Sequence, residues 1–176
     1  MRNVRVRILV ESAVMIALAT VLSLIKVYSL PQGGSITLGS MLPILFIGFR
    51  WGARAGLATG VVYGVLQYIV EPFFVHPVQV ILDYPVAFGL LGLSGLFRGP
   101  TALSGALGAF TGLGGRYLAH FLSGWVFFAE YAPAGTSPVV YSLVYNATYL
   151  GPELVVTLVL GALLPVTLRR AQPVQG

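Results

Sequence analysis

A glycine recurs at every fourth position in Gly52-Ala-Arg-Ala-Gly-Leu-Ala-Thr-Gly-Val-Val-Tyr-Gly64, the start of an apolar segment that ends at Val70. In a helix, residues four apart lie on one face, so these glycines form a stripe without side chains. Such a stripe lets another backbone approach closely, and helix association in lipid depends on packing of this kind rather than on the hydrophobic effect. The stretch predicts a membrane-spanning helix over about residues 55–70 that packs against another helix of the same chain.

The rest of the chain shares the apolar character of this segment. Hydrophobic residues make up 57% of its 176 residues and charged residues 9%, whereas a soluble domain has about 25% charged residues. Since a span needs about 20 residues, the length allows about six spans with short loops and no separate soluble domain. We therefore predict an all-α membrane protein with six transmembrane helices, in which residues 1–176 form a single integral membrane domain.

Apolar segments separated by loops rich in glycine, proline and polar residues predict where these helices lie. They are expected over about residues 8–28, 38–49, 55–70, 78–97, 103–128 and 139–168. The second segment is short for a span. We expect it either to be extended by Ile36 and Thr37 or to be shielded by neighbouring helices.

Basic residues predict the orientation of the protein, because they occur at both termini and in every second loop. By the positive-inside rule these parts are cytoplasmic, with short tails at about residues 1–7 and 169–176 of a multi-pass membrane protein. The net charge of +5 is spread over these loops, which argues against nucleic acid as a partner. The basic residues concerned are Arg2, Arg5, Arg7, Arg50, Arg54, Arg98, Arg169 and Arg170.

Asp83 is the residue most indicative of function, because an ionisable side chain within a span costs about 2.5–3.5 kcal/mol on insertion scales and usually faces a partner or a cavity. One interpretation is an interfacial aspartate, or one that pairs with Arg116 on another helix. The other is a carboxylate that receives a cation or an amine donor. Tyr84 follows Asp83 in the sequence, and Gln79 lies one turn earlier.

Arg116, His120 and Gly124 recur every four residues and therefore share one face of the fifth helix. Two histidines, His76 and His120, together with Asp83 allow a metal-binding alternative. The chain has no local His-x-x-x-His or Glu-x-x-His pair and no cysteine, so a binding site without metal is favoured.

Aromatic residues cluster toward the outer ends of the predicted helices. Any one of them fits an interfacial aromatic belt. Taken together with Asp83 and Asn146, they suit a pocket for a small, flat, positively charged heterocycle, because ring faces attract cations while a carboxylate and an amide fix donors and acceptors. These aromatics are Phe73, Phe74, Tyr84, Trp125, Phe128, Tyr131, Tyr141, Tyr145 and Tyr149.

Catalysis finds little support in the sequence. It contains no Gly-x-x-x-x-Gly-Lys-Ser/Thr phosphate loop and no Gly-x-Ser-x-Gly elbow. Ser123 and His120 would act as a hydrolase only if their geometry coincided across helices. We therefore expect a binding protein without a cofactor and without enzymatic activity of its own.

From about Val6 to Leu168 the chain resembles the thiamin-specific substrate-binding (S) component of energy-coupling-factor vitamin transporters. The glycine-rich stretch from Gly33 is common to many S components, and the other stretches point to thiamin. The stretches are Gly33-Gly-Ser-Ile-Thr-Leu-Gly-Ser-Met-Leu-Pro43, His76-Pro-Val-Gln-Val-Ile-Leu-Asp-Tyr84, Gly95-Leu-Phe-Arg98, Arg116-Tyr-Leu-Ala-His-Phe-Leu-Ser-Gly124 and Tyr141-Ser-Leu-Val-Tyr-Asn146.

The resemblance implies a six-helix protein that captures thiamin near the outer surface and associates with a transmembrane coupling protein and two ATP-binding cassette ATPases. It implies that Asp83, with Tyr84 beside it, binds the aminopyrimidine and that His120 lies near the thiazolium. Phe128, with Trp125 one turn earlier, falls where a relative can present a stacking tryptophan. The remaining site positions carried over are Arg116, Gly124, Tyr141 and Asn146.

Four further points concern this resemblance. Asp83 is one methylene shorter than the glutamate that relatives can hold, and Gly34 stands where relatives can offer a first-loop tryptophan. Ala13-Val-Met-Ile-Ala17 resembles the surface that docks on the coupling protein, and ordinary internal packing is its alternative interpretation. An S component for a different vitamin is the nearest rival, because only the pocket residues would differ.

Overall fold

The computed structural model describes the backbone of residues 2–171 and the side chains of residues 3–163. Helix α1 (Arg2–Ser23) is followed by a hairpin of β1 (Lys26–Ser29) and β2 (Ser35–Thr37), and then by α2 (Leu42–Trp51) and α3 (Ala53–Val70). The next rod is continuous but irregular: α4 (Pro77–Ile81), a π-helical turn η1 (Leu82–Val86), α5 (Ala87–Leu90) and a 3-10 segment η2 (Leu91–Leu96). Helix α6 (Ala102–Phe127), a short 3-10 turn η3 (Ala129–Tyr131) and α7 (Pro138–Ala171) complete the described chain.

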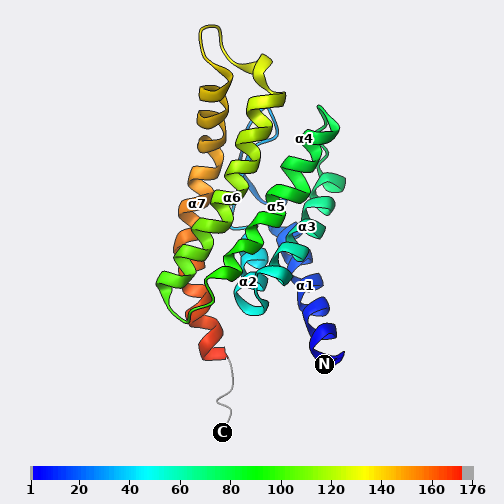
Figure 1. Cartoon of the computed structure of the whole chain (residues 1–176), viewed down its shortest axis with the longest axis vertical. Coiled ribbons are helices and arrows are strands. Elements are labelled where there is room, and N and C mark those ends of the chain that lie inside the picture. Colours follow the sequence, from blue (N-terminus) through cyan, green and yellow to red (C-terminus); the bar gives the residue numbers. More distant parts are fainter. Residues whose placement is uncertain (1, 172–176) are drawn as a thin grey trace.

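Six helical rods therefore run through the described residues, and among them α6 and α7 lie side by side along the long axis of the molecule (Figure 1). Four of them are long and apolar enough to cross a membrane: Asn3–Ser23, Ala53–Val70, Pro77–Leu96 and Pro138–Leu163. The 26-residue α6 is long enough, but its glycines and Arg116 lower its apolar character. The predicted helical membrane protein is thus confirmed, while the number of complete spans stays a prediction.

Both described ends of the chain, Arg2 and Ala171, lie at the same end of the bundle, together with the α2–α3 junction and the loop over residues 97–101 (Figure 1). Arg50 and Arg98 meet there, since the Arg98 guanidinium donates to the Arg50 carbonyl over 3.1 Å. The basic segments therefore lie at one end of the bundle, as their occurrence at both termini and in every second loop predicts. The prediction of orientation also used Arg2, Arg169 and Arg170, whose side chains lie outside the described residues.

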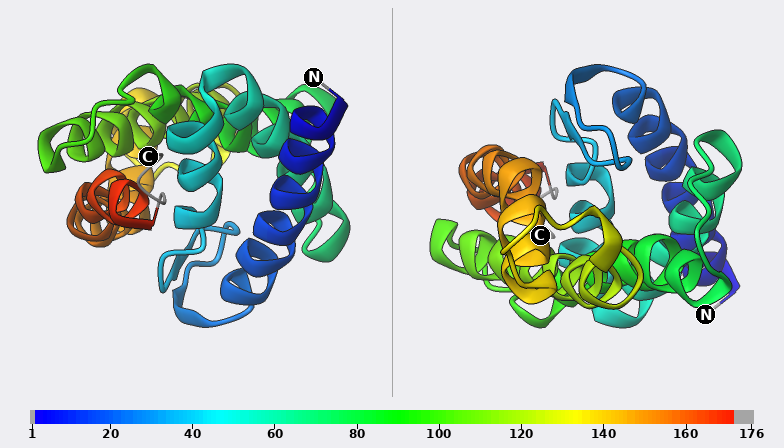
Figure 2. Two further views of the ribbon diagram at one scale, coloured as in Figure 1. Left: turned by 90° about the horizontal axis from the view of Figure 1, so that it is seen from below. Right: turned by 90° about the horizontal axis from the view of Figure 1, so that it is seen from above.

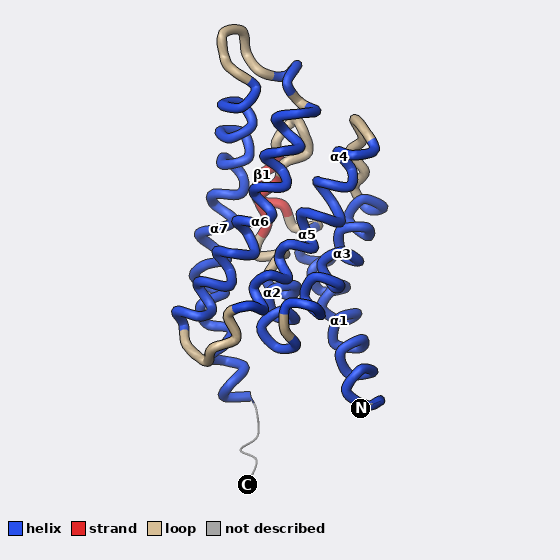
Figure 3. Tube along the Cα trace, viewed as in Figure 1, coloured by secondary structure: helices blue, strands red, loops and turns tan. Residues whose placement is uncertain are grey.

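The first helix ends at Ser23, earlier than the predicted residue 28. Residues 26–37 form an antiparallel hairpin instead of continuing the helix (Figure 3). Its strands contain residues that favour extended backbone, such as Val27 and Ile36. The turn contains Pro31 and Gly33, whose φ of 87° suits glycine. The all-α prediction is therefore wrong for this hairpin, which lies between α1 and α7 when seen along the long axis (Figure 2).

Helix α2 is only 10 residues long, and Ile36 and Thr37 belong to β2 rather than extending it. The first of the two expectations for this segment is therefore wrong. The second is confirmed, because Ile44, Leu45 and Ile47 are each 0% exposed and surrounding helices cover α2. A helix enclosed on all sides is shielded by protein, so it does not need the length of a lipid-exposed span.

The glycine stripe of α3 packs against the irregular rod over residues 77–96, as predicted. A β-carbon added at Gly56 would lie 2.8 Å from the α-carbon of Gly92, and one at Gly64 would lie 2.6 Å from the carbonyl carbon of Tyr84. Gly60 meets Gly89 and the backbone oxygen of Phe88 in the same way. These close backbone approaches fix the depth and rotation of the rod that carries Asp83.

Substitution at this contact tests the packing. Gly60→Ala is expected to lower the stability of the protein by about 1–3 kcal/mol, because the new methyl group collides with backbone that has no flexible side chain to move. Thermal unfolding in detergent measures the loss. Gly114→Ala on α6 is the matched control, since nothing lies within 4 Å of its added β-carbon. Equal melting temperatures for Gly60→Ala and the wild type would contradict the close packing.

Candidate substrate-binding site

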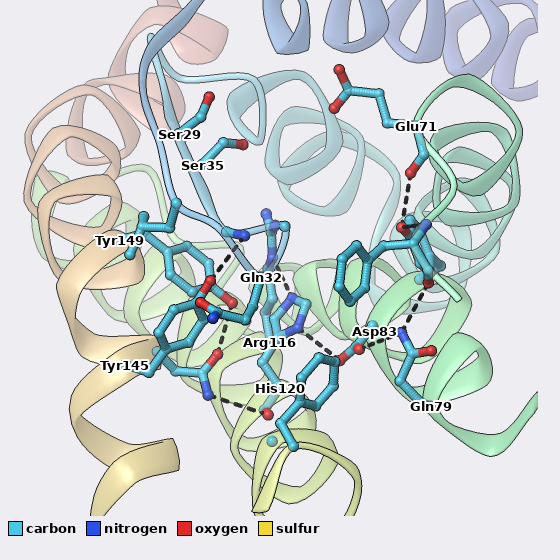
Figure 4. Close-up of a pocket in the computed structure, with 18 of the residues that line it drawn as sticks. Ser29, Gln32, Ser35, Glu71, Gln79, Asp83, Arg116, His120, Tyr145 and Tyr149 are labelled. Atoms are coloured by element: carbon cyan, nitrogen blue, oxygen red, sulfur yellow. Dashed lines mark hydrogen bonds and ion pairs between the residues drawn. The ribbon is translucent and has the colours of Figure 1, made fainter. Parts of the chain in front are cut away.

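A cavity of about 390 Å³ lies between the hairpin, the loop after α3, the irregular rod, α6 and α7. Figure 4 shows polar side chains from several of these elements pointing toward one another around it. The lining includes Asp83, Arg116 and His120 on one side and Tyr145 and Tyr149 of α7 on another. Such a concave, partly apolar site with a few convergent polar groups is typical of a small-molecule pocket.

Asp83 lies in the π-helical turn of the rod, two residues before Pro85. Proline has no backbone N–H to donate, so the regular helical ladder is interrupted there, and π turns of this kind recur at functional sites. The carboxylate oxygen Oδ2 accepts from Gln79 Nε2 over 2.8 Å and from Ser123 Oγ over 2.9 Å, and Oδ1 lies 2.9 Å from His120 Nδ1. The side chain is only 14% exposed, so these donors replace most of its hydration.

Arg116 reaches Asp83 through His120 rather than directly. Arg116 Nε donates to His120 Nε2 over 3.3 Å, while the guanidinium lies over the ring of Phe88 at 4.2 Å from its centroid. An arginine can only donate, so Nε2 is the acceptor and His120 carries its proton on Nδ1, directed at Asp83. The interpretation in which Asp83 pairs directly with Arg116 is therefore wrong, because the imidazole stands between the two charges.

One face of α7 meets the hairpin. Tyr145 Oη accepts from the Gly34 backbone N–H over 3.4 Å, and the Tyr149 ring lies where a β-carbon on Gly34 would be. One turn further, the buried Glu153 accepts from both the backbone N–H and the hydroxyl of Thr37. Three successive turns of α7 thus hold the hairpin over the cavity.

Asn146 joins α7 to α6 behind these tyrosines. Its amide nitrogen donates to the Ser142 carbonyl over 2.9 Å and to the His120 carbonyl over 3.3 Å. Its amide oxygen accepts from Tyr149 Oη over 2.7 Å. The amide is therefore fixed in one orientation, and it holds α7 against the segment of α6 that carries His120.

Most of the residues predicted for the site from the sequence line this cavity. They are Asp83, Tyr84, Arg116, His120, Gly124, Phe128, Tyr141 and Asn146.

Trp125 is outside the lining. It is 45% exposed and stacks on Phe121, with the ring centroids 6.1 Å apart. Each residue turns a helix by about 100°, so the residue after Gly124 points away from the face that Gly124 shares with Phe128. The expected contact of Trp125 with the ligand is not formed by this geometry.

His76 also lies away from Asp83. Its Nδ1 caps α4 by accepting from the Val78 N–H over 3.1 Å, and its ring stacks on Phe127 at 4.9 Å. Among the side chains of residues 3–163, no group of three or more metal-ligating residues is found. The alternative metal site of Asp83, His76 and His120 is therefore not assembled.

Several residues around the cavity were not predicted from the sequence as site residues. Ser123 donates a hydrogen bond to Asp83. Its position three residues after His120 places both side chains on the same part of the helix surface and could have indicated this contact. Lys26 and Glu71 form an ion pair of 2.5 Å at the mouth of the cavity, between the hairpin and the end of α3. No sequence pattern indicates that pair, because 45 residues separate its members.

Ala13 and Ala17 are both exposed on the outer surface of α1, whereas Ala19 on another face is fully buried. Internal packing, the alternative interpretation of this small-residue stripe, is therefore wrong for the described chain. The N-terminal half of α1 is tied to α2, since Glu11 pairs with Arg50 over 2.6 Å and accepts from Trp51 Nε1 over 2.8 Å. The alanine stripe remains available to a partner.

Comparison with known proteins places this geometry in a family. Residues 9–172 match the family described as thiamine transporter protein. The chain is 41% identical to the thiamine transporter ThiT of Bacillus subtilis (strain 168), over 92% of each chain. It is 32% identical to ThiT of Lacticaseibacillus paracasei, over 90% of this chain and 87% of that one.

The fold agrees with that of a solved relative. A structure of ThiT from Listeria monocytogenes superposes with a TM-score of 0.80 at 27% identity, covering 94% of this chain and 97% of that one. The sequence resemblance to a thiamin-specific protein is confirmed by these matches. The chain belongs to the thiamine transporter protein family.

Proposed function

We propose that this protein is the thiamin-binding S component of an energy-coupling-factor importer and that it captures thiamin from the outer side of the bacterial cell membrane. The observation that carries the proposal is the Asp83 carboxylate, held within a span by three donors at the wall of an aromatic-lined cavity. Thiamin joins an aminopyrimidine, which offers donors and acceptors, to a thiazolium cation. The cavity offers groups suited to both parts.

The charges of the cavity lining suit a cation held by aromatic faces. Lys26 is paired with Glu71, and Arg116 is balanced by Asp83, so the formal charges of these lining residues cancel. A thiazolium ring therefore meets no unbalanced positive charge. Aromatic ring faces attract cations, by about 2 kcal/mol or more where water is excluded.

We assign each residue a role on this basis. Asp83, with Tyr84 beside it, accepts from the aminopyrimidine, and His120 lies against the thiazolium. Phe128 supplies a stacking surface; its ring lies nearly parallel to that of Phe73, at 5.9 Å. Arg116 orients His120, the small Gly124 leaves room for the ligand, and Tyr141 and Asn146 form the wall on α7. Trp125 has no direct contact in this assignment.

The transport step is assigned to partners. The chain belongs to a transporter family rather than to an enzyme family, and its sequence contains no phosphate-binding loop of the kind that hydrolyses ATP. We infer that a transmembrane coupling protein and two ATP-binding cassette ATPases supply the energy and that both termini face them in the cytoplasm. The exposed Ala13–Ala17 stripe would let a helix of the coupling protein approach closely.

Asp83→Asn tests the proposed ligand carboxylate. The substitution is expected to weaken thiamin binding by about 2–4 kcal/mol, because it removes a charged acceptor from a largely desolvated site. Calorimetric titration in detergent measures the change. Glu130→Gln, at an exposed carboxylate beyond α6, is the matched control and should bind as the wild type does. Wild-type affinity of Asp83→Asn would remove the central residue of the site.

A tryptophan at position 128 tests the stacking surface. The chain has only two tryptophans, so in a Trp125→Phe background the substitution Phe128→Trp introduces a reporter inside the cavity. Thiamin is expected to quench its fluorescence strongly, because the cationic ring would lie against the indole. Trp125→Phe alone should keep wild-type affinity by calorimetry. Binding without quenching in the double variant would place the ligand elsewhere.

Bulk on α1 tests the docking surface. Ala13→Trp and Ala17→Trp, singly and together, are expected to leave thiamin binding intact but to abolish uptake in cells that supply the coupling protein and ATPases. Val14→Trp is the control, because Val14 is 56% exposed but points about 100° away around the helix. Wild-type uptake by the double variant would show that the partner docks elsewhere.

A further inference from the structure

Gln79 is a buried amide whose hydrogen-bonding capacity is fully used. It is 1% exposed. Its amide nitrogen donates to Asp83 Oδ2 over 2.8 Å and to the Phe73 carbonyl over 3.2 Å. Its amide oxygen accepts from the backbone N–H of Val75 over 3.0 Å and of His76 over 3.5 Å. The amide has only one possible orientation, because the reverse would place its oxygen against the Asp83 carboxylate and the Phe73 carbonyl.

This fixed amide determines which part of Asp83 is open to a ligand. A carboxylate oxygen has about two lone-pair positions. Oδ2 uses both, for Gln79 and Ser123, whereas among the described side chains Oδ1 has one partner, His120. A donor entering the cavity therefore finds one acceptor position on Oδ1, beside the imidazole.

We infer that Gln79 is a positioning residue for ligand recognition: it locks the Asp83 carboxylate in the rotamer that presents Oδ1 to the cavity. The inference rests on the proposed function, in which Asp83 accepts from the aminopyrimidine. Figure 4 shows Gln79 on the side of Asp83 remote from Tyr145 and Tyr149. Gln79 thus acts through Asp83 rather than by touching the ligand.

Gln79 also helps to hold the loop that carries Phe73, and this second role has to be separated from the first. Tyr84 holds the same loop independently, because its hydroxyl accepts from the Phe73 N–H over 2.9 Å and donates to the Glu71 carbonyl over 2.8 Å. Ser123 on α6 does the opposite: its hydroxyl donates to Asp83, and it is not part of the loop. These two residues provide separate controls for the two roles.

A double-mutant cycle between Gln79→Glu and Asp83→Asn tests the inference. The new carboxylate at position 79 can still accept from Val75 and His76 but faces Asp83 Oδ2 with a second negative oxygen. Thiamin affinity, measured by calorimetry, is expected to fall by about tenfold or more, the equivalent of about 1.4 kcal/mol. In the Asp83→Asn background the asparagine amide can donate to the new carboxylate, so the same substitution is expected to cost no more than about threefold.

Two further cycles keep the test decisive if Gln79→Glu does not fold. Ser123→Ala is expected to weaken binding in the wild type and to have little effect in the Asp83→Asn background. Tyr84→Phe removes two hydrogen bonds to the loop and none to Asp83, so it is expected to lower affinity by the same factor in both backgrounds. If Gln79→Glu lowers thiamin affinity equally in both backgrounds, the inference about Gln79 is overturned while the proposed function stands. If Gln79→Glu does not fold, the same result for Ser123→Ala has that consequence. Wild-type affinity of Asp83→Asn would overturn the proposed function, and with it the inference.

Discussion

A carboxylate inside a bilayer has to be surrounded by hydrogen-bond donors, and the arrangement around Asp83 follows from that requirement. Donors come from its own rod through Gln79 and from α6 through Ser123 and His120. The imidazole in turn accepts from Arg116, so one negative and one positive charge are joined without direct contact. Because removing any member leaves a buried group unsatisfied, the network defines how the rod and α6 face each other.

The glycine contacts make this network possible. The rod over residues 77–96 can present Asp83 to α6 only if its opposite side lies closely against α3, and glycines on both helices allow that approach. Around this pair the remaining elements complete the cavity. Helix α7 contributes its tyrosines and Asn146, while Glu153 binds Thr37 of the hairpin. The shape of the cavity thus depends on backbone packing between helices as well as on the residues that line it.

Local patterns predicted the parts of the fold that depend on local chemistry. The four-residue glycine spacing identified the packing face of α3, and the cost of a charge in lipid identified Asp83. The hairpin was missed because residues 24–28 are as apolar as the helix before them; its formation depends on Thr37 and Gly34 docking on α7, which is remote in sequence. Trp125 was predicted as a site residue because it is close to Phe128 in sequence, but the rotation of the helix turns its side chain away from the cavity. The partners of Asp83 required the tertiary structure, because spacing alone cannot choose between His120 and Arg116.

The central claim is that this cavity selects thiamin rather than another vitamin on the same fold. The most direct measurement is to purify the wild-type protein in mild detergent from cells grown with a mixture of vitamins, and to identify the small molecule released on denaturation by mass spectrometry. Thiamin is expected as the principal released ligand, in proportion to the protein. A different vitamin released in that proportion, with thiamin absent, would contradict it.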